Sequence, residues 1–452
     1  MKRALVSEEE SIPEFIPQVV VKFRGSKELP YSDAAERSFG RRDSMMWSRL
    51  AKQFRGITLK RLFTSLGPDE LKQLEPAANL LQDMEWRAPE LLSFYAIECP
   101  PETKPAVLLG ALREWEAVES AYEGGAPAPP PSGPVLDDPQ YRQQRYLRPA
   151  PEGIDVEPLW RAGGTGAGMR LVDLEQNWGL SHRDLPASIG RLPGAFRYDA
   201  SHGTSVLGIL VAADNREFCL GIAPGAAASV ISEYRTVQSA QPNPADAITV
   251  ALRNTLRFGD ILLLETQYHR QSDRSLWPSE TDLAVRRVIE TAVRRGIVVI
   301  EAAGNGGNDL DAFIEPGGAR PLNLAGGDPG NSGAILVGAA SAAVPHTRLL
   351  SSNYGQRVNC YGWGESVFTL AAGPPWFTPN FNGTSSAAAI VAGAAAAVQS
   401  LAKKRFGRCY SPLALRALLT GSGTASANPE TDRIGVMPDL SRVAKNLPPP
   451  EA

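Results

Sequence analysis

The chain has 452 residues, which is too many for one small hydrophobic core, so its length predicts two domains. Hydrophobic residues make up 43% and charged residues 21%, and the formal net charge is −3. This balance is typical of a compact globular protein and argues against a nucleic-acid or membrane-surface partner. No apolar run is expected to reach the length of a membrane span.

The cysteines and the first residues indicate the cellular compartment in which the protein is expected. The four cysteines, Cys99, Cys219, Cys360 and Cys409, are scattered and include no Cys-x-x-Cys pair. This spacing argues against a zinc site and against a disulfide scaffold, so we expect reduced thiols. The first ten residues contain no apolar segment typical of a secretory signal, which favours a cytoplasmic location and leaves export by another route open.

The first elements in chain order predict a small α+β domain. The patterns indicate strands at residues 18–24, 57–63, 91–97 and 118–122, and helices around residues 47–54, 68–81 and 107–115. The order βαβ followed by βαβ is that of a split ferredoxin-like domain. An unrelated α+β accessory domain is the alternative.

A stretch rich in proline and glycine follows this first domain. Residues 124–137 contain Pro129-Pro130-Pro131 and read as a stiff, exposed linker. The predicted organisation is a first domain at 1–123, this linker, a second domain at 138–446 and a tail at 447–452.

The second domain alternates apolar strands with helices. Strands are expected at 167–174, 229–233, 261–265, 297–302 and 335–339, and helices at 203–213, 244–257, 280–295 and 385–401. Such alternation predicts an α/β fold with a mostly parallel sheet covered by helices on both faces. Functional residues are then expected at the carboxyl ends of the strands.

Three residues at the edges of these elements can together make a nucleophile. Asp173 ends a strand, His202 lies in His-Gly-Thr, and Ser385 opens an alanine-rich helix. A serine hydroxyl becomes a useful nucleophile when an imidazole takes its proton and an acid orients that imidazole. Each motif alone is more often a helix cap or a turn, but their order along the chain is that of one class of serine peptidase.

Asn305 supplies a fourth element. It follows the apolar strand at 297–302 and brings a side-chain amide to the point where an acyl-transfer intermediate would develop negative charge. An ordinary Asn-Gly turn explains Asn305 equally well when it is considered alone.

Together these motifs resemble the subtilase (subtilisin-like) family of serine peptidases, peptidase family S8. The resemblance runs from about residue 138 to 444 and rests on the acid, histidine, asparagine and Gly383-Thr-Ser-Ser-Ala segments. It implies a subtilisin-like three-layer fold and identifies the N-terminal domain as similar to the family's inhibitory propeptide. It also implies that Asp173 orients the imidazole, that His202 is general base and then acid, and that Ser385 is the nucleophile. The oxyanion would be bound by the Asn305 amide and the backbone N–H of Ser385.

The strand at 261–265 departs from the family pattern. Where subtilases usually have Ser-Leu-Gly-Gly, this chain has Glu265, Thr266 and Gln267, which we expect to narrow the cleft and make it more acidic. Glu265 would then favour basic residues in the substrate, or would pair with an arginine of the protein. The resemblance implies that Ala302, Ala303 and Gly304 also contact substrate.

No cofactor is required by this chemistry, but a calcium ion is possible. By their spacing, Gln143, Asp184 and Asn215 resemble a calcium site of the family, and oxygen ligands suit this ion. Three polar side chains on loops are also what ordinary turns contain.

The sequence favours a serine endopeptidase of restricted specificity that acts on protein or peptide substrates. Its own N-terminal domain would act as an intramolecular inhibitor. Two alternatives remain, namely a catalytically silent peptide-binding pseudoprotease and a transamidase or macrocyclase of the same fold. The first would require a lost catalytic residue, and the second is distinguished by its products.

Overall fold

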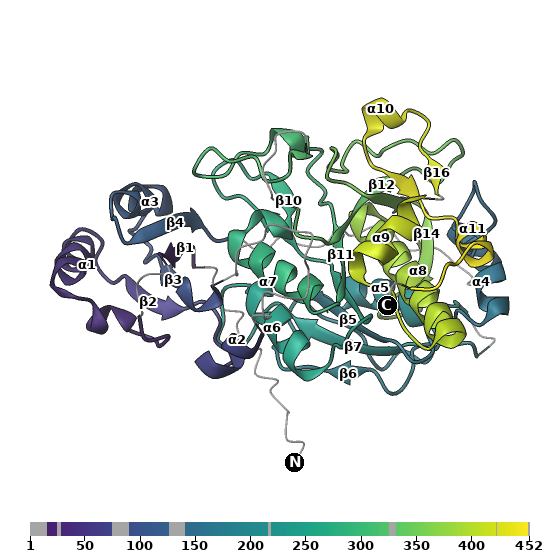
Figure 1. Ribbon diagram of the computed structural model, residues 1–452, viewed down its shortest axis with the longest axis horizontal. Helices are drawn as coiled ribbons and strands as arrows, with labels where there is room; N and C mark the ends of the chain where they lie inside the picture. The colour runs from purple at the N-terminus through teal and green to yellow at the C-terminus, as the bar shows by residue number, and fades with distance from the viewer. Residues whose placement is uncertain are drawn as a thin grey trace, which may run out of the picture.

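The computed structural model describes residues 16–24, 29–74, 90–125, 141–215, 218–324, 331–421 and 423–450. They form a smaller N-terminal domain, purple to blue in Figure 1, and a larger domain that runs from teal to yellow. Residues 126–137 of the linker predicted at 124–137, and residues 451–452 of the tail predicted at 447–452, lie outside the described residues.

Within the described residues, the N-terminal domain is a four-stranded antiparallel sheet with three α-helices, of which the second is the shortest. Its strands are β1 (Gln18–Phe23), β2 (Thr58–Arg61), β3 (Phe94–Glu98) and β4 (Val118–Glu123). The helices are α1 (Arg41–Gln53), α2 (Pro68–Leu74) and α3 (Pro105–Arg113). The strand order β2-β3-β1-β4 is that of the predicted ferredoxin-like fold. Edge-to-face aromatic contacts of Phe23 with Tyr95 and Trp115 fill its core.

The larger domain is built on a nine-stranded sheet in the order β16-β17-β13-β12-β11-β8-β5-β7-β6. The strands that carry the site are β5 (Arg170–Glu175), β7 (Ala227–Ser232), β8 (Ile261–Leu264), β11 (Val298–Ala302) and β12 (Ile335–Ala340). The edges are β6 (Gly190–Arg191), β13 (Cys360–Trp363), β16 (Thr424–Ala425) and β17 (Val436–Met437). β6, β7, β5, β8, β11, β12, β13 and β17 pair in parallel, and β16 pairs antiparallel with β17.

Helices cover both faces of this sheet. One face packs against α5 (Ser201–Val211) and α8 (Gly383–Phe406), and the other packs against α6 (Pro244–Asn254) and α7 (Leu283–Arg294). Shorter helices at the periphery are α4 (Glu157–Ala162), α9 (Pro412–Gly421), α10 (Pro429–Asp432) and α11 (Leu440–Lys445). Successive side chains of β5 alternate between the faces: Leu171 joins the cluster that contains α8, and Val172 joins the cluster that contains α6 and α7.

Helix α8 corrects one expectation from the sequence. Its 24 residues include a window apolar enough to cross a membrane, although no such run was expected. All of that window is buried inside the protein, where alanine, valine and glycine allow close packing against the sheet. The helix is therefore the central core helix of the domain.

Other elements agree with the sequence in kind and differ at their ends. The helix predicted at 68–81 is described only as Pro68–Leu74, because residues 75–89 are not described. The strand predicted at 91–97 begins at Phe94, after a short 3₁₀ turn. Two hairpins were not predicted at all: β9 (Gln267–His269) with β10 (Leu276–Pro278), and β14 (Val367–Leu370) with β15 (Phe377–Phe381).

Candidate active site

His202 is held by a buried glutamate. It is the second residue of α5, and its Nδ1 lies 2.8 Å from Oε2 of Glu175, the last residue of β5. The side chains of both residues are about 95% buried. A carboxylate that bonds one ring nitrogen fixes the tautomer and leaves the other nitrogen to accept a proton. The imidazole therefore has an orienting acid.

That acid is not the one expected from the sequence. Asp173 is fully buried on β5, but its Oδ2 accepts a hydrogen bond from the indole Nε1 of Trp178 at 2.7 Å. The predicted pairing of Asp173 with His202 is therefore wrong in this structure. Asp173 and Glu175 point to the same face of β5, and the longer side chain at the end of the strand reaches the ring.

Asp173 lies next to Glu175 on the same face of β5 and affects its charge. Burial, followed by the negative charge of Glu175, raises the pKa of Asp173 well above its usual range, and Asp173 Oδ1 and Glu175 Oε1 have no hydrogen-bond partner among the described residues. We infer that Asp173 holds a proton and donates it toward Glu175, because two adjacent buried carboxylates are not both ionised. The indole of Trp178 and the acid of Asp173 thus keep Glu175 in place as the charged partner of His202.

Ser385 opens α8 next to this pair. It is the third residue of the helix and is 5% exposed. α5 packs against α8, and the ring of His202 makes an edge-to-face contact with Phe381, at a centroid distance of 5.2 Å. Phe381 ends β15, directly before the turn that leads into α8. The histidine and the serine segment therefore lie side by side.

Asn305 is anchored with a defined orientation. Its Oδ1 accepts hydrogen bonds from the backbone N–H of Thr384 at 2.9 Å and from the Thr384 hydroxyl at 3.2 Å. A backbone N–H only donates, so the oxygen of the amide must face Thr384 and the NH₂ group must face away. The backbone N–H of Asn305 also bonds Oε1 of Gln267 at 3.1 Å. The arrangement frees the Asn305 NH₂ group as a donor next to Ser385.

Two glycines allow these close approaches. Gly383 has a φ of +84°, and a Cβ there would lie 3.0 Å from Asn305 Oδ1. A Cβ at Gly203 would lie 2.4 Å from both the Asn177 carbonyl and the Trp178 ring. Side chains at these positions would separate Asn305 from the serine segment and α5 from the loop after β5.

The residues predicted to contact substrate are placed differently from the expectation. Glu265 and Thr266 are buried, and the Thr266 hydroxyl bonds Ser279 Oγ at 2.9 Å, so neither lines an open cleft. Gln267 does line a pocket. Backbone groups of Ala303 and Gly304 are bonded to Val337, Asn353 and Thr384, which holds the strand end that presents Asn305. The side chain of Ala302 is buried in the core.

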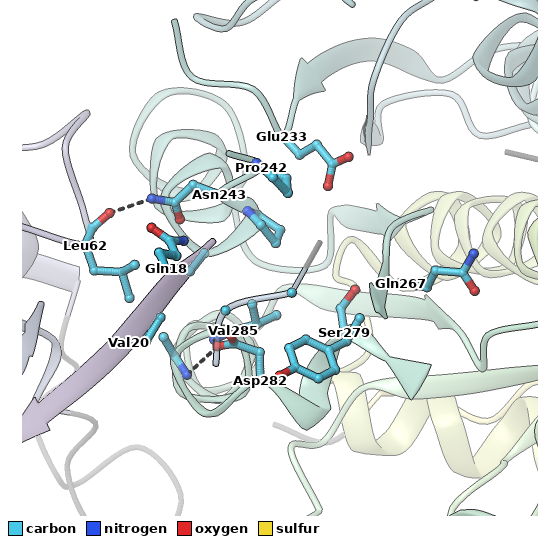
Figure 2. A pocket seen from close by; sticks show the side chains of 16 residues that line it. Gln18, Val20, Leu62, Glu233, Pro242, Asn243, Gln267, Ser279, Asp282 and Val285 are labelled. Carbon is cyan, nitrogen blue, oxygen red and sulfur yellow. Dashed lines mark hydrogen bonds between the residues drawn. The ribbon is translucent and has the colours of Figure 1, made fainter. Parts of the chain in front are cut away.

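A pocket lies between the two domains (Figure 2). Its lining includes Gln18 and Leu62 from the N-terminal domain and Glu233, Asn243 and Gln267 from the larger domain. Gly124 and Gly125, which directly follow β4, also line the pocket. A Cβ on Gly125 would lie 2.8 Å from the ring of Tyr268. Gln267 connects this pocket to Asn305, so the N-terminal domain ends at the approach to the candidate site.

The N-terminal domain is hydrogen-bonded to the N-terminal ends of α6 and α7. The Tyr122 hydroxyl donates to Asp282 Oδ1 at 2.7 Å and accepts from the backbone N–H of Ala284 at 2.9 Å. Asn243 Nδ2 bonds the Leu62 carbonyl at 2.6 Å, as Figure 2 shows. The backbone N–H of Ser65 bonds Asp246 Oδ1 at 2.8 Å. Both helix N-termini thus receive partners from the first domain.

The residues considered for calcium occupy unlike environments. Gln143 and Asn215 are exposed, whereas Asp184 is fully buried and its Oδ2 accepts the backbone N–H of Cys219 at 3.0 Å. The glutamine that enters this region is the neighbouring Gln144, which makes two hydrogen bonds to the backbone of Leu220. Calcium binding by Gln143, Asp184 and Asn215 stays a prediction from the sequence.

Sequence reasoning missed Glu175, Thr384 and Asn353. Glu175 was detectable as an acid two residues after Asp173 on the same strand face, at the carboxyl end of the strand. Thr384 and Asn353 act through backbone contacts made across the fold, for which the sequence gives no signal.

Comparisons with known proteins identify the relatives of this chain. A model of the subtilase family matches residues 193–435, more than half of the chain and a range that contains His202, Asn305 and Ser385. An intracellular serine protease of Paenibacillus polymyxa is 26% identical over 322 residues, which is 67% of this chain and 90% of that protein. Subtilisin E of Bacillus subtilis (strain 168) is 27% identical over 264 residues, 56% of this chain and 62% of that protein.

The chain thus spans less than two thirds of the length of that subtilisin. Among solved structures, fervidolysin from Fervidobacterium pennivorans has a TM-score of 0.56 at 15% identity, over 97% of this chain and 62% of that one. A lanthipeptide protease has a TM-score of 0.51 at 17% identity, over 68% of this chain and 96% of that one. These structures share the fold, and the matched family model shows that this chain belongs to the subtilase family.

Proposed function

We propose that this protein is a serine peptidase that hydrolyses peptide bonds through Ser385, His202 and Glu175. The observation that carries the proposal is the 2.8 Å pair of His202 with a buried glutamate, next to the helix that Ser385 opens. His202 would take the proton of Ser385 as the hydroxyl attacks the carbonyl, and Glu175 would stabilise the resulting imidazolium.

Asn305 would stabilise the oxyanion of the tetrahedral intermediate. Its NH₂ group faces away from Thr384, and the N-terminus of α8 adds partial positive charge at the same place. His202 would then return its proton to the leaving amine, and water would release the acyl group by the reverse sequence of steps.

Labelling with a fluorophosphonate tests this proposal. The reagent should modify Ser385 in the wild type, and Ser385→Ala should abolish the modification. Ser386→Ala is a matched control, because the Ser386 hydroxyl bonds the carbonyls of Trp363 and Gly383 and takes no part in the chemistry. Unmodified Ser385 in wild-type protein from which the N-terminal domain has been released would favour a pseudoprotease. Cyclised or transamidated peptide products in place of free carboxylates would favour a transamidase.

We also propose that the N-terminal domain inhibits the enzyme in cis. The end of β4 enters the pocket that leads to Gln267, and the Tyr268 hydroxyl bonds the Glu123 carbonyl. A tethered segment acts at an effective concentration of about millimolar, so that modest affinity keeps a cleft occupied. Self-cleavage between about residues 123 and 141 would release it. The wild type should then be cut and Ser385→Ala should stay full length, whereas cutting of both at equal rates would show that another protease is responsible.

A further inference from the structure

Glu265 lies on the same face of the sheet as the candidate catalytic residues. It directly follows β8, and its backbone N–H continues the ladder by bonding the Leu174 carbonyl at 3.1 Å. Ile261 and Leu263 of β8 pack in the cluster that contains α5 and α8. Because side chains alternate along a strand, Glu265 points toward α5 and α8, and Glu175 of the neighbouring strand does the same.

The carboxyl of Glu265 has no partner that explains its burial. The residue is 9% exposed, and within the described part of the chain neither oxygen has a hydrogen bond of ordinary geometry. The expected arginine partner is therefore not seen among these residues. A buried polar group without a partner destabilises the folded state, so its retention in the core calls for a functional reason.

The groups that act on Glu265 belong to the candidate active site. Burial and then the carboxyls of Asp173 and Glu175 raise its pKa well above the usual range, and the Ser385 hydroxyl lowers it by less. Asp173 and Glu175 come from β5, Ser385 comes from α8, and Glu175 in turn bonds His202 on α5. The neutral form of Glu265 is therefore favoured more strongly than that of an exposed glutamate, next to the nucleophile.

The protonation of Glu265 has a direct consequence for Ser385, which has a single hydroxyl proton. A neutral carboxyl can donate its own proton to a lone pair of the serine oxygen, which leaves the hydroxyl proton free for His202. An ionised carboxyl can only accept, so it competes with His202 for the hydroxyl proton.

We propose that Glu265 is a further catalytic residue, which contacts the Ser385 hydroxyl and permits its reaction only while Glu265 holds a proton. The proposal rests on the function proposed above. In the permitted state Ser385 Oγ forms its new bond to the electrophile, the hydroxyl proton moves to His202, and the proton of Glu265 stays on its carboxyl. Ionisation of Glu265 removes the permitted state and so limits activity on the alkaline side.

The pH dependence of serine reactivity tests this role. Full-length protein is treated with diisopropyl fluorophosphate, a small reagent from which Ser385 displaces fluoride as its proton passes to His202. The labelling rate is followed by mass spectrometry from about pH 5 to about pH 10. In the wild type it should rise as His202 loses its proton and then fall about tenfold per pH unit above the ionisation of Glu265.

Glu265→Gln, which cannot ionise, should keep the rise and lose the alkaline fall. Glu301→Gln is the matched control: Glu301 is also a buried glutamate with a raised pKa, but it lies on β11 and faces away from α8. It should retain the fall. Glu265→Met, an apolar residue of similar volume, provides a second variant if glutamine impairs folding, which thermal unfolding would reveal.

The outcomes separate the two proposals. An unchanged alkaline fall in both Glu265 variants, or a wild-type profile without such a fall, overturns the role of Glu265 and leaves the peptidase proposal intact. A wild type in which Ser385 is labelled at no pH, even after cleavage of the linker has released the N-terminal domain, refutes the peptidase proposal, and the role of Glu265 fails with it.

Discussion

Glu175 and Asp173 offer a sharp test of which acid serves His202. Glu175→Gln replaces a carboxylate that accepts from His202 Nδ1 at 2.8 Å by an amide of the same shape. Its NH₂ group can donate to Nδ1 and so stabilises the wrong tautomer, in which Nε2 carries the proton and cannot act as base. In serine peptidases of known triad the equivalent change lowers kcat by about 10⁴. At 1.36 kcal/mol per factor of ten, this is about 5.4 kcal/mol of transition-state stabilisation.

Asp173→Asn should have a much smaller effect. Because Asp173 already carries a proton, an asparagine can donate its NH₂ group to Glu175 and accept from Trp178 as the native acid does. The change replaces one hydrogen bond by a similar one, worth about 0.5–1.5 kcal/mol, so kcat should fall by no more than about tenfold.

Steady-state hydrolysis of one peptide substrate by the two variants and the wild type measures the difference. Thermal unfolding of each variant controls for folding, since Asp173 is fully buried. The reasoning fails if Asp173→Asn loses about 10⁴ in kcat and Glu175→Gln loses about tenfold, because the order of the two acids would then be reversed.

Three further predictions follow from the site and its surroundings. Asn305→Ala should lower kcat by about 10²–10³ with little change in KM, as observed for a subtilisin oxyanion donor; an unchanged kcat would contradict the role of its NH₂ group. Tyr122→Phe removes the hydrogen bonds to Asp282 and Ala284, so the full-length protein should hydrolyse a peptide about tenfold faster. Tyr95→Phe should not have this effect, because the Tyr95 hydroxyl bonds Pro30 within the N-terminal domain. Burial raises the pKa of Glu233 to about 7, so the protonated form is favoured in the folded state and stability is lost as pH rises from about 4.5 to about 7. Glu233→Gln should lose less free energy of unfolding over that interval than the wild type, by up to about 3 kcal/mol; parallel denaturant curves at both pH values would exclude this effect.

The sequence contained most of the fold because its long elements have strong periodic signals. The strand before Asn305 and the helix after Ser385 are apolar over most of their length, and a buried parallel sheet and a buried helix suit such runs. Short elements such as β9 and β14 depend on tertiary pairing, and their sequences carry no comparable signal.

The candidate site was predictable as a set of motifs, but the sequence alone does not decide whether Asp173 or Glu175 is its acid. Asp173 and Glu175 share a strand face, and the distance from each to His202 depends on side-chain length and on how α5 packs. Those quantities arise only when the strand and helix are assembled. The same limit applies to Glu265, whose sequence position suggested a cleft wall and whose side chain is instead buried beside Ser385.

The composition of α8 has a practical meaning for anyone who wishes to change what this enzyme recognises. Residues 387–398 of the helix are fully buried and almost all small, so enlarging any of them would move the backbone that carries Ser385. Useful variation is therefore confined to the pocket-lining segments, such as the β9–β10 hairpin, which can be remodelled without displacing the helix. An engineering library directed at pocket-lining positions that do not hold Asn305, such as Tyr268, would leave the candidate catalytic groups in place, whereas one spread evenly over the chain would spend most of its members on inactive proteins.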